Sequence, residues 1–204
     1  MRAFASLSLA VLLAVSFAAP AAARGKAHPT APGKYTDWNG EFDELEIVAS
    51  FKLADYAKVV VEPFDTSATP LPQKDDNTYE PVQRVLARVT PPFTAGLSGG
   101  LPKPQVMLAE EKGVSEPQVL LVRGTVTIMD PGSRAARYWA SFGAGAARTQ
   151  IVGEVVDAES GKVLLRFTQE RRSGFGAAGG GYEELMERNL VQIGGDVAGI
   201  LKFF

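Results

Sequence analysis

The chain of 204 residues has no cysteine and a single histidine, His28. Without cysteine there is no disulfide, no thiol catalysis, no thiolate metal ligand and no lipid attached at a lipoprotein cysteine. His28 lies in a segment that we expect outside the folded domain. A Ser-His-acid triad therefore lacks an ordered base, and a histidine-based metal site fails for the same reason. The sequence predicts no metal and no cofactor.

A surplus of positive charge is also missing. The chain carries 21 basic and 23 acidic residues, for a formal net charge of −2. A nucleic-acid-binding protein needs a basic surplus gathered on one face, so we expect no nucleic-acid partner. The composition, 46% hydrophobic and 22% charged, is that of a globular chain able to bury a sizeable core.

The first 23 residues have the three parts of a cleavable secretion signal. Arg2 supplies a short positive region, residues 3–18 are uncharged and largely apolar, and the alanines at 21–23 fit an A-x-A cleavage pattern. The alternative is an uncleaved membrane anchor, but the apolar stretch is shorter than the ~20 residues of a spanning helix. We expect cleavage near Ala23 and a periplasmic or secreted protein without a lipid anchor.

The rest of the chain divides into two parts. Residues 24–34 are rich in glycine and proline and poor in apolar residues, so we expect a disordered lead-in. Residues 35–204 have the length of a single domain. Within it, residues 35–56 form an ordered arm whose secondary structure the pattern does not define.

In the first half of the domain, the valines at 59–61 predict a buried strand. Apolar residues at helical spacing over 82–89 predict a helix, which Pro91 and Pro92 end or kink. We expect a loop over residues 96–104, and then a short strand.

In the second half, alternating polar and apolar residues over 119–129, 148–155 and 163–170 predict an antiparallel meander with one wet face. The first strand of the meander has five residues on its buried face: Leu120, Val122, Gly124, Val126 and Ile128.

Residues 182–204 have an apolar stripe at helical spacing and predict a helix. Gly194, Gly195 and Gly199 lower its intrinsic stability by up to ~1 kcal/mol each, so we expect it to lean on the sheet with its backbone close. The predicted order is β-α-β-β-β-β-α. It gives a two-layer α+β fold with a mostly antiparallel sheet and helices on one face.

Three stretches between about residues 51 and 204 resemble one bacterial family. They are an aromatic residue leading into a valine strand that ends in Pro-Phe (56–64), an arginine before a Gly-x-Gly (137–145), and a D-x-x-S-G turn into a strand (157–164). The chain resembles the family known as domain of unknown function 4410. The resemblance implies an exported envelope protein, often a lipoprotein in that family, with no catalytic residues to carry over.

Two short motifs have plain structural explanations. The run at 174–179 spells G-x-G-x-x-G, but no second strand follows the next helix, so we interpret it as a flexible connection and not as a dinucleotide site. The acidic run at 75–77 lacks the alternate spacing and glycine of a calcium loop, and we interpret it as an acidic surface loop.

Polar residues elsewhere leave several hypotheses open. Asp43, Glu44 and Glu46 are candidates for paired-carboxylate hydrolysis by composition alone. The wet face of the meander could bind a polymer or a small ligand, although cross-strand ion pairs explain its residues more simply. That face carries Arg123, Arg148, Arg166, Gln150, Glu154 and Glu170.

The segment between the first two meander strands, residues 132–145, is the strongest candidate for a partner-binding loop. Arginine, tyrosine and tryptophan are enriched at interface hot spots. The candidate residues are Arg134, Arg137, Tyr138, Trp139 and Phe142. Alternatively, Trp139 and Phe142 close the end of the core.

We therefore expect a non-catalytic periplasmic binding or envelope-assembly protein that holds an envelope protein through its sheet edge or this loop. The alternatives are a carboxylate-based hydrolase acting on an envelope polymer and a small-ligand-binding protein. The sequence does not predict an oligomeric state.

Overall fold

The computed structural model describes residues 28–38, 42–133, 145–173 and 181–204. The strands are β1 (Gly33–Trp38), β2 (Phe42–Ile47), β3 (Lys58–Val61), β4 (Gln105–Leu108), β5 (Val119–Asp130), β6 (Ala147–Asp157) and β7 (Val163–Ser173). The helices are α1 (Tyr79–Leu86), α2 (Thr90–Gly100) and α4 (Tyr182–Leu201), with a 3-10 turn η1 (Leu53–Asp55). The predicted signal, residues 1–23, lies outside the described residues.

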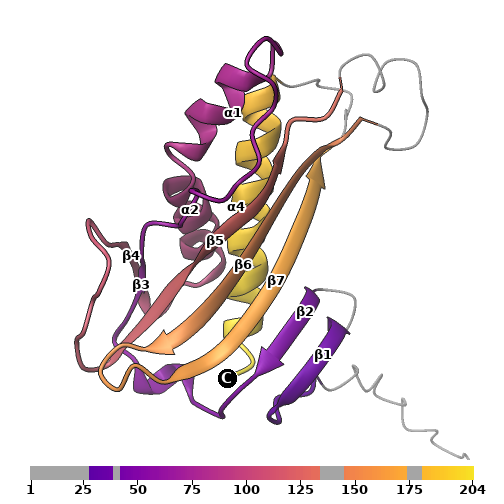
Figure 1. Ribbon diagram of the computed structural model, residues 1–204. Helices are drawn as coiled ribbons and strands as arrows, with labels where there is room; N and C mark the ends of the chain where they lie inside the picture. The colour runs from indigo at the N-terminus through magenta and orange to yellow at the C-terminus, as the bar shows by residue number, and fades with distance from the viewer. Residues whose placement is uncertain (1–27, 39–41, 134–144, 174–180) are drawn as a thin grey trace, which may run out of the picture.

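All seven strands form one sheet in the order β1-β2-β7-β6-β5-β3-β4. The pairs β1-β2, β2-β7, β7-β6 and β6-β5 are antiparallel, whereas β3 runs parallel to both β5 and β4. Figure 1 shows α1, α2 and α4 together on one side of this sheet. The predicted class, a two-layer α+β fold with a mostly antiparallel sheet and helices on one face, is confirmed.

The N-terminal arm is a β-hairpin that adds two strands to the predicted order. β2 pairs with β7 over four residues, and where that ladder ends Asp43 continues it with its side chain. The Asp43 amide donates to Oε1 of Gln169 at 3.0 Å, and its Oδ2 accepts the Glu170 amide at 2.7 Å. β1 begins at Gly33, so the strand includes two residues that we expected in the lead-in.

Pro91 and Pro92 begin a helix instead of ending one. α1 stops at Leu86, and α2 starts at Thr90 with the prolines in its first turn, where their missing N–H groups would have no helical partner. Residues 96–100, which we expected in a loop, form the end of α2. The prediction was wrong here because the same two prolines are compatible with either end of a helix.

Gly194 of α4 faces another helix and not the sheet. A Cβ atom on Gly194 would lie 2.1 Å from the carbonyl oxygen of Phe93, and one on Gly96 would lie 1.9 Å from that of Val191. Such distances are impossible, so the two glycines allow α2 and α4 to pack backbone against backbone. We expected the backbone of α4 to lie close to the sheet. The close approach exists, but it is to α2, so the predicted partner was wrong.

A β-bulge in β5 changes which residue enters the core. The pairing with β6 shifts between Val126 and Ile128, so that Met129 takes the place expected of Ile128. Met129 is buried and pairs with the fully buried Thr149, whereas Ile128 pairs with Gln150 of the outer face.

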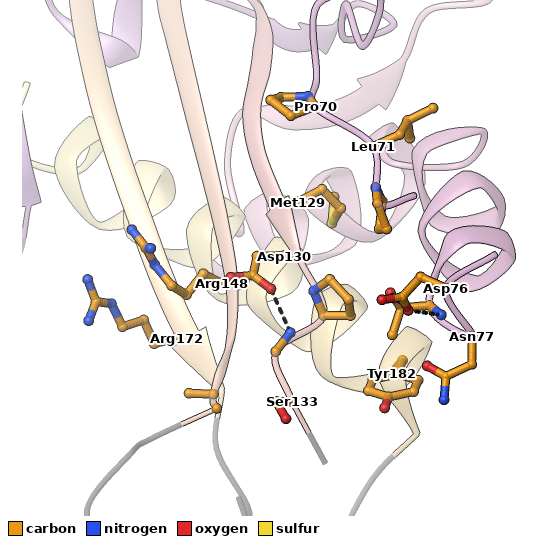
Figure 2. Close-up of a pocket in the computed structure, with 16 residues that line it drawn as sticks. Pro70, Leu71, Asp76, Asn77, Met129, Asp130, Ser133, Arg148, Arg172 and Tyr182 are labelled. Atoms are coloured by element: carbon orange, nitrogen blue, oxygen red, sulfur yellow. Dashed lines mark hydrogen bonds between the residues drawn. The ribbon is translucent and has the colours of Figure 1, made fainter. Parts of the chain in front are cut away.

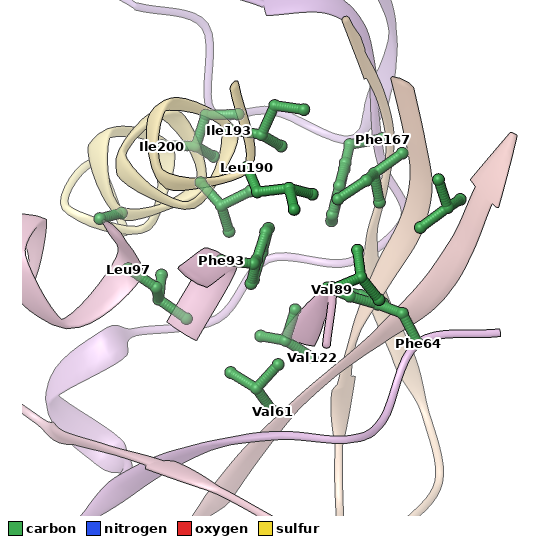
Figure 3. Close-up of a cluster of buried hydrophobic side chains, with 14 of the residues drawn as sticks. Val61, Phe64, Val89, Phe93, Leu97, Val122, Phe167, Leu190, Ile193 and Ile200 are labelled. Carbon is green, nitrogen blue, oxygen red and sulfur yellow. The ribbon is translucent and has the colours of Figure 1, made fainter. Parts of the chain in front are cut away.

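The main core lies between the helices and the sheet. Figure 3 shows Phe93 of α2 between Leu190 of α4 and Val122 of β5. Phe93 is fully buried and meets Phe64 edge-on with ring centroids 4.8 Å apart. Burying a side chain of this kind contributes about 1.5–3 kcal/mol, which explains how a chain without disulfides holds its layers together.

The outer face of the sheet is not polar throughout. A small apolar cluster of Val60, Val119, Leu121, Val156 and Ala158 lies there, with Val114 of the loop before β5 packed against it. The buried Glu62 holds this loop because its Oε1 accepts a hydrogen bond from the Gly113 amide at 2.5 Å.

No helix in the described part of the chain is long and apolar enough to cross a membrane.

Candidate functional site

A cleft of about 970 Å³ opens at the end of the sheet where β5 finishes and β6 begins. Five segments of the chain form its walls: the loop before α1, the end of β5, the start of β6, the end of β7 and the start of α4. Figure 2 shows Arg148 and Arg172 on one side, Asp76, Asn77 and Tyr182 on the other, and Asp130 between them. We call it the sheet-end cleft.

The arginine side of the cleft is organised by one carboxylate. Glu170 accepts a hydrogen bond from Arg148 Nη2 at 2.8 Å and another from Arg172 Nε at 2.6 Å, so it orients both guanidinium groups. Hydrogen bonding to Arg148 is the main cause that lowers the pKa of Glu170, and Glu170 in turn raises the pKa of Arg148. Two arginines thus share one ionised partner and keep further N–H donors for a bound group.

The acidic side is built from turn residues. Oδ1 of Asp76 accepts both the amide and the hydroxyl of Thr78, and these bonds lower the pKa of Asp76. Oδ1 of Asp130 accepts the Gly132 amide at 2.8 Å. Both carboxylates are therefore held in place by hydrogen bonds from the local backbone.

A buried polar network joins α4 to the two strands that carry Arg148 and Arg172. Asn189 of α4 is fully buried; its Oδ1 accepts the Ser173 hydroxyl at 2.5 Å and its Nδ2 donates to the Ala147 carbonyl at 3.1 Å. Its Nδ2 also reaches the Thr149 hydroxyl at 3.4 Å. These bonds fix α4 to the ends of β6 and β7. We did not predict Asn189, although an asparagine at a core position of an apolar helical stripe was the available signal.

The predicted partner-binding loop leaves and re-enters the described structure at this cleft. Ser133 and Gly145, the described residues on either side of it, both line the cleft. The candidate residues Arg134, Arg137, Tyr138, Trp139 and Phe142 lie outside the described residues, as does the Gly-rich run at 174–179.

Two of the three candidate carboxylates of the arm, Asp43 and Glu46, are used in structural contacts. Asp43 bonds the backbone of β7, and Glu46 pairs with Arg166 at 3.1 Å. In the described residues, no group of three or more His, Cys, Asp or Glu side chains could hold a metal ion. His28 stacks on Phe203 with ring centroids 4.0 Å apart, next to Trp38.

The outer face of the meander is a ladder of ion pairs. Arg123 pairs with Glu154 at 2.7 Å, and Arg166 lies between Glu154 at 3.8 Å and Glu46. Exposed pairs of this type contribute about 0.2–1 kcal/mol each. The ladder therefore accounts for the alternation of charge without a ligand.

One hydrogen bond joins two of the stretches on which the family resemblance rests. The Tyr56 hydroxyl donates to Oδ2 of Asp157 at 3.0 Å, and Oδ1 of Asp157 accepts the amide and hydroxyl of Ser160. Gly161 completes the turn with φ of +70°, a conformation that favours glycine. The D-x-x-S-G turn thus links the β6–β7 connection to the segment that enters β3.

Three solved structures of low sequence identity are similar to the chain. The PelC dodecamer from Paraburkholderia phytofirmans is 13% identical, with a TM-score of 0.43 over 74% of this chain and 96% of that chain. A DUF330 protein from Xanthomonas campestris is 9% identical, with a TM-score of 0.40 over 72% and 84%. Lipoprotein GNA1162 from Neisseria meningitidis is 13% identical, with a TM-score of 0.31 over 61% and 84%.

No curated protein matches the chain. The model of the family described as "domain of unknown function (DUF4410)" matches residues 59–177, which begin in β3 and extend past β7. This match covers more than half of the sequence, and it agrees with the family that the three stretches indicated. The chain belongs to the DUF4410 family.

Proposed function

We propose that this protein is a non-catalytic binding protein of the bacterial cell envelope that holds an envelope partner in the sheet-end cleft. The observation that carries the proposal is the position of the cleft. Its walls include the two described residues, Ser133 and Gly145, that flank the predicted partner-binding loop. A partner held close to the two ends of this loop would therefore also contact the cleft.

The chemistry of the cleft supports recognition of a polar peptide surface. Arg148 and Arg172 offer N–H donors, Asp76 and Asp130 offer acceptors, and Leu71 provides an apolar contact with 45% of its surface exposed. Arginine clusters bind carboxylates with directional hydrogen bonds. The buried Asn189 network supports the site because it fixes the strands that carry these groups.

Export is part of the proposal and rests on the signal pattern of residues 1–23. Mass spectrometry of the protein recovered from cells gives the mature N-terminus. We expect a chain that begins at Arg24, in the soluble envelope or culture fraction. An intact N-terminus in the membrane fraction would mean an anchored protein.

Photo-crosslinking in intact cells tests the binding role. A photoreactive residue at Leu71 is compared with one at Val191, a site on α4 outside the cleft with 41% of its surface exposed. We expect a defined partner to crosslink from Leu71 and not from Val191. Equal labelling from both positions, or none from Leu71, would contradict the proposal.

The arginines provide a matched control. Replacing Arg148 and Arg172 together by alanine should reduce crosslinking from Leu71 at least about tenfold, because the hydrogen bonds to the partner are lost. Arg123→Ala removes an arginine of the outer ladder and should leave crosslinking unchanged. If a small molecule and no protein is captured, a ligand-induced rise in thermal stability would identify a small-ligand-binding protein instead.

A further inference from the structure

The β4 edge of the sheet is short, apolar and open. Among the described strands, β4 is the last of the sheet and pairs only with β3. Met107 and Leu108 expose 42% and 44% of their surfaces, among the largest values for apolar side chains in the described residues. An open strand edge with apolar side chains is a template for pairing with another chain.

The backbone of β4 shows which groups are available. The Ala109 amide donates to the Val61 carbonyl of β3 at 2.9 Å. Because backbone groups alternate in direction along a strand, Val106 and Leu108 direct their N–H and C=O groups to the open edge. Val106 packs against the helix-side core, so Leu108 shares that side and Met107 lies on the outer face.

The charges at the two ends of β4 are complementary. Lys103 lies just before the strand, and Glu110 and Glu111 follow it; all three are exposed. The next basic residue, Lys112, lies near Asp65, and the positive charge of Lys112 helps to lower the pKa of Asp65. A second copy of β4 placed antiparallel would bring the lysine of each copy to the acidic end of the other.

A groove of about 1050 Å³ lies beside β4 on the helix side. Its walls include Tyr56, Leu101, Val106 and Phe204, and Phe204 is held by stacking on Phe51 at 4.6 Å. Most of the residues that line the groove are apolar. It can therefore receive an apolar side chain that approaches along the open edge.

We propose that two copies of this protein pair through β4 about a two-fold axis at Met107. Val106 of each copy lies opposite Leu108 of the other, so both residues use their edge N–H and C=O groups and each Leu108 enters the other copy's groove. Met107 meets its own counterpart in a non-hydrogen-bonded pair on the outer face. This assembly goes beyond the proposed function, because the sheet-end cleft lies at the opposite end of β5 and stays open.

The register follows from the faces of the strand, from Pro104, and from the charges at its ends, because an axis on Leu108 would take Lys103 away from Glu111. A two-fold axis perpendicular to the sheet keeps each face on its own side, so only residues of the same face can lie opposite each other. Centring the axis on Val106 would place Leu108 opposite Pro104, which has no N–H to donate. Centring it on Met107 avoids that loss and leaves all four edge groups paired.

Sedimentation equilibrium of the purified protein tests whether the dimer exists. We expect a concentration-dependent dimer, weak because a four-residue strand buries less than a standard interface. Met107→Lys places two like charges at the axis and should raise the dissociation constant at least about tenfold. Thr36→Lys adds a lysine to the exposed β1 strand instead and should leave the dissociation constant unchanged. A monomer at every concentration, or equal effects of both variants, would overturn the proposal.

Cysteine crosslinking tests the register, and the absence of native cysteine makes the result unambiguous. In the proposed dimer the two Met107 Cα atoms are about 4.5 Å apart, within reach of a disulfide, whereas the two Leu108 Cα atoms are about 8 Å apart. Met107→Cys should therefore form a disulfide-linked dimer on oxidation and Leu108→Cys should not. Equal crosslinking of the two variants, or crosslinking of Leu108→Cys alone, would overturn the register.

Discussion

The two edges of the sheet differ in how they meet solvent. β4 at one end exposes Met107 and Leu108 and carries no charged residue. β1 at the other end exposes Lys34 and Asp37. Asp37 has φ of +50°, and it is skipped in the pairing of β1 with β2. Charges and an irregular backbone are devices that protect an edge from pairing, and β4 has neither within the strand.

The β1 edge is also held down by aromatic side chains. Trp38 is buried, its indole N–H donates to the Pro29 carbonyl at 3.1 Å, and its ring contacts His28 and Phe203. The chain before β1 is thereby fastened to the end of α4. One edge is therefore closed by the protein itself, whereas the other is left for a second copy.

The largest expected effect concerns the closed edge. Trp38→Ala removes the side chain that joins β1 to the end of α4 and should lower the free energy of unfolding by about 3–5 kcal/mol. Denaturant unfolding monitored by circular dichroism measures it. Tyr35→Phe is the control: it removes only an exposed hydrogen bond to Ala31 and should cost less than about 1 kcal/mol. Equal losses would mean that the aromatic cluster does not close this edge.

The next effect concerns the helices behind β4. Gly194→Ala places a methyl group against the Phe93 carbonyl, so α2 must move and the free energy of unfolding should fall by about 1–3 kcal/mol or more. Gly199→Ala adds the same methyl group where nothing lies within 4 Å, and it should stabilise the helix by up to about 1 kcal/mol. Thermal unfolding of both variants gives the two signs. A stabilised Gly194→Ala protein would disprove the backbone contact.

The smallest effect concerns the wall of the β4 groove. Tyr56→Phe removes the hydrogen bond to Asp157 and should cost about 0.5–1.5 kcal/mol at neutral pH. Burial, and then this hydrogen bond, raise the pKa of Tyr56 from 10.0 to about 12. Because the folded state holds the phenol proton more tightly, this stabilisation is complete below about pH 10 and is lost as the pH rises toward 12.

Unfolding curves from pH 9 upward, compared between the wild type and Tyr56→Phe, measure this dependence. The difference in unfolding free energy between the two proteins should shrink as the pH rises above 10. Tyr79→Phe, at a tyrosine whose hydroxyl accepts only an exposed bond from Gln83, corrects for the general effect of losing a phenol. A constant difference across this range would contradict the predicted shift.

The sequence predicts most of the two-layer fold because its strands and helices follow simple periods. The alternation from Thr149 to Val155 in β6 predicts its faces correctly, as it does for Leu165 and Phe167 in β7. The register shift at Val156 places Val163, which we expected in the core, on the outer face. The arm was harder to predict, because at Asp43 side chains take over from backbone pairing and the alternation of a strand is lost. Pro91 and Pro92 fit either end of a helix, and only the packing of α2 on α4 decides between them.

The site was less accessible from sequence. The cleft depends on residues that lie far apart in the chain, such as Asp76, Asp130 and Arg172, and no local pattern brings them together. The bulge at 126–128 adds one residue to β5, so that Met129 and not Ile128 enters the core. Alternation of polar and apolar residues alone does not reveal this. The open β4 edge is a property of strand order. The sequence pattern of a four-residue strand does not show whether the strand lies at the centre or at the edge of a sheet.

Amide hydrogen exchange along β4 tests the contrast between the two edges most directly. It is measured at protein concentrations below and above the dissociation constant of the dimer. The amides of Val106 and Leu108 should exchange at least about tenfold more slowly at the high concentration, because the second copy accepts their hydrogen bonds. Those of Lys34 and Thr36 in β1 should be unchanged. β4 amides that exchange at the same rate at both concentrations, or slowing confined to β1, would contradict the account.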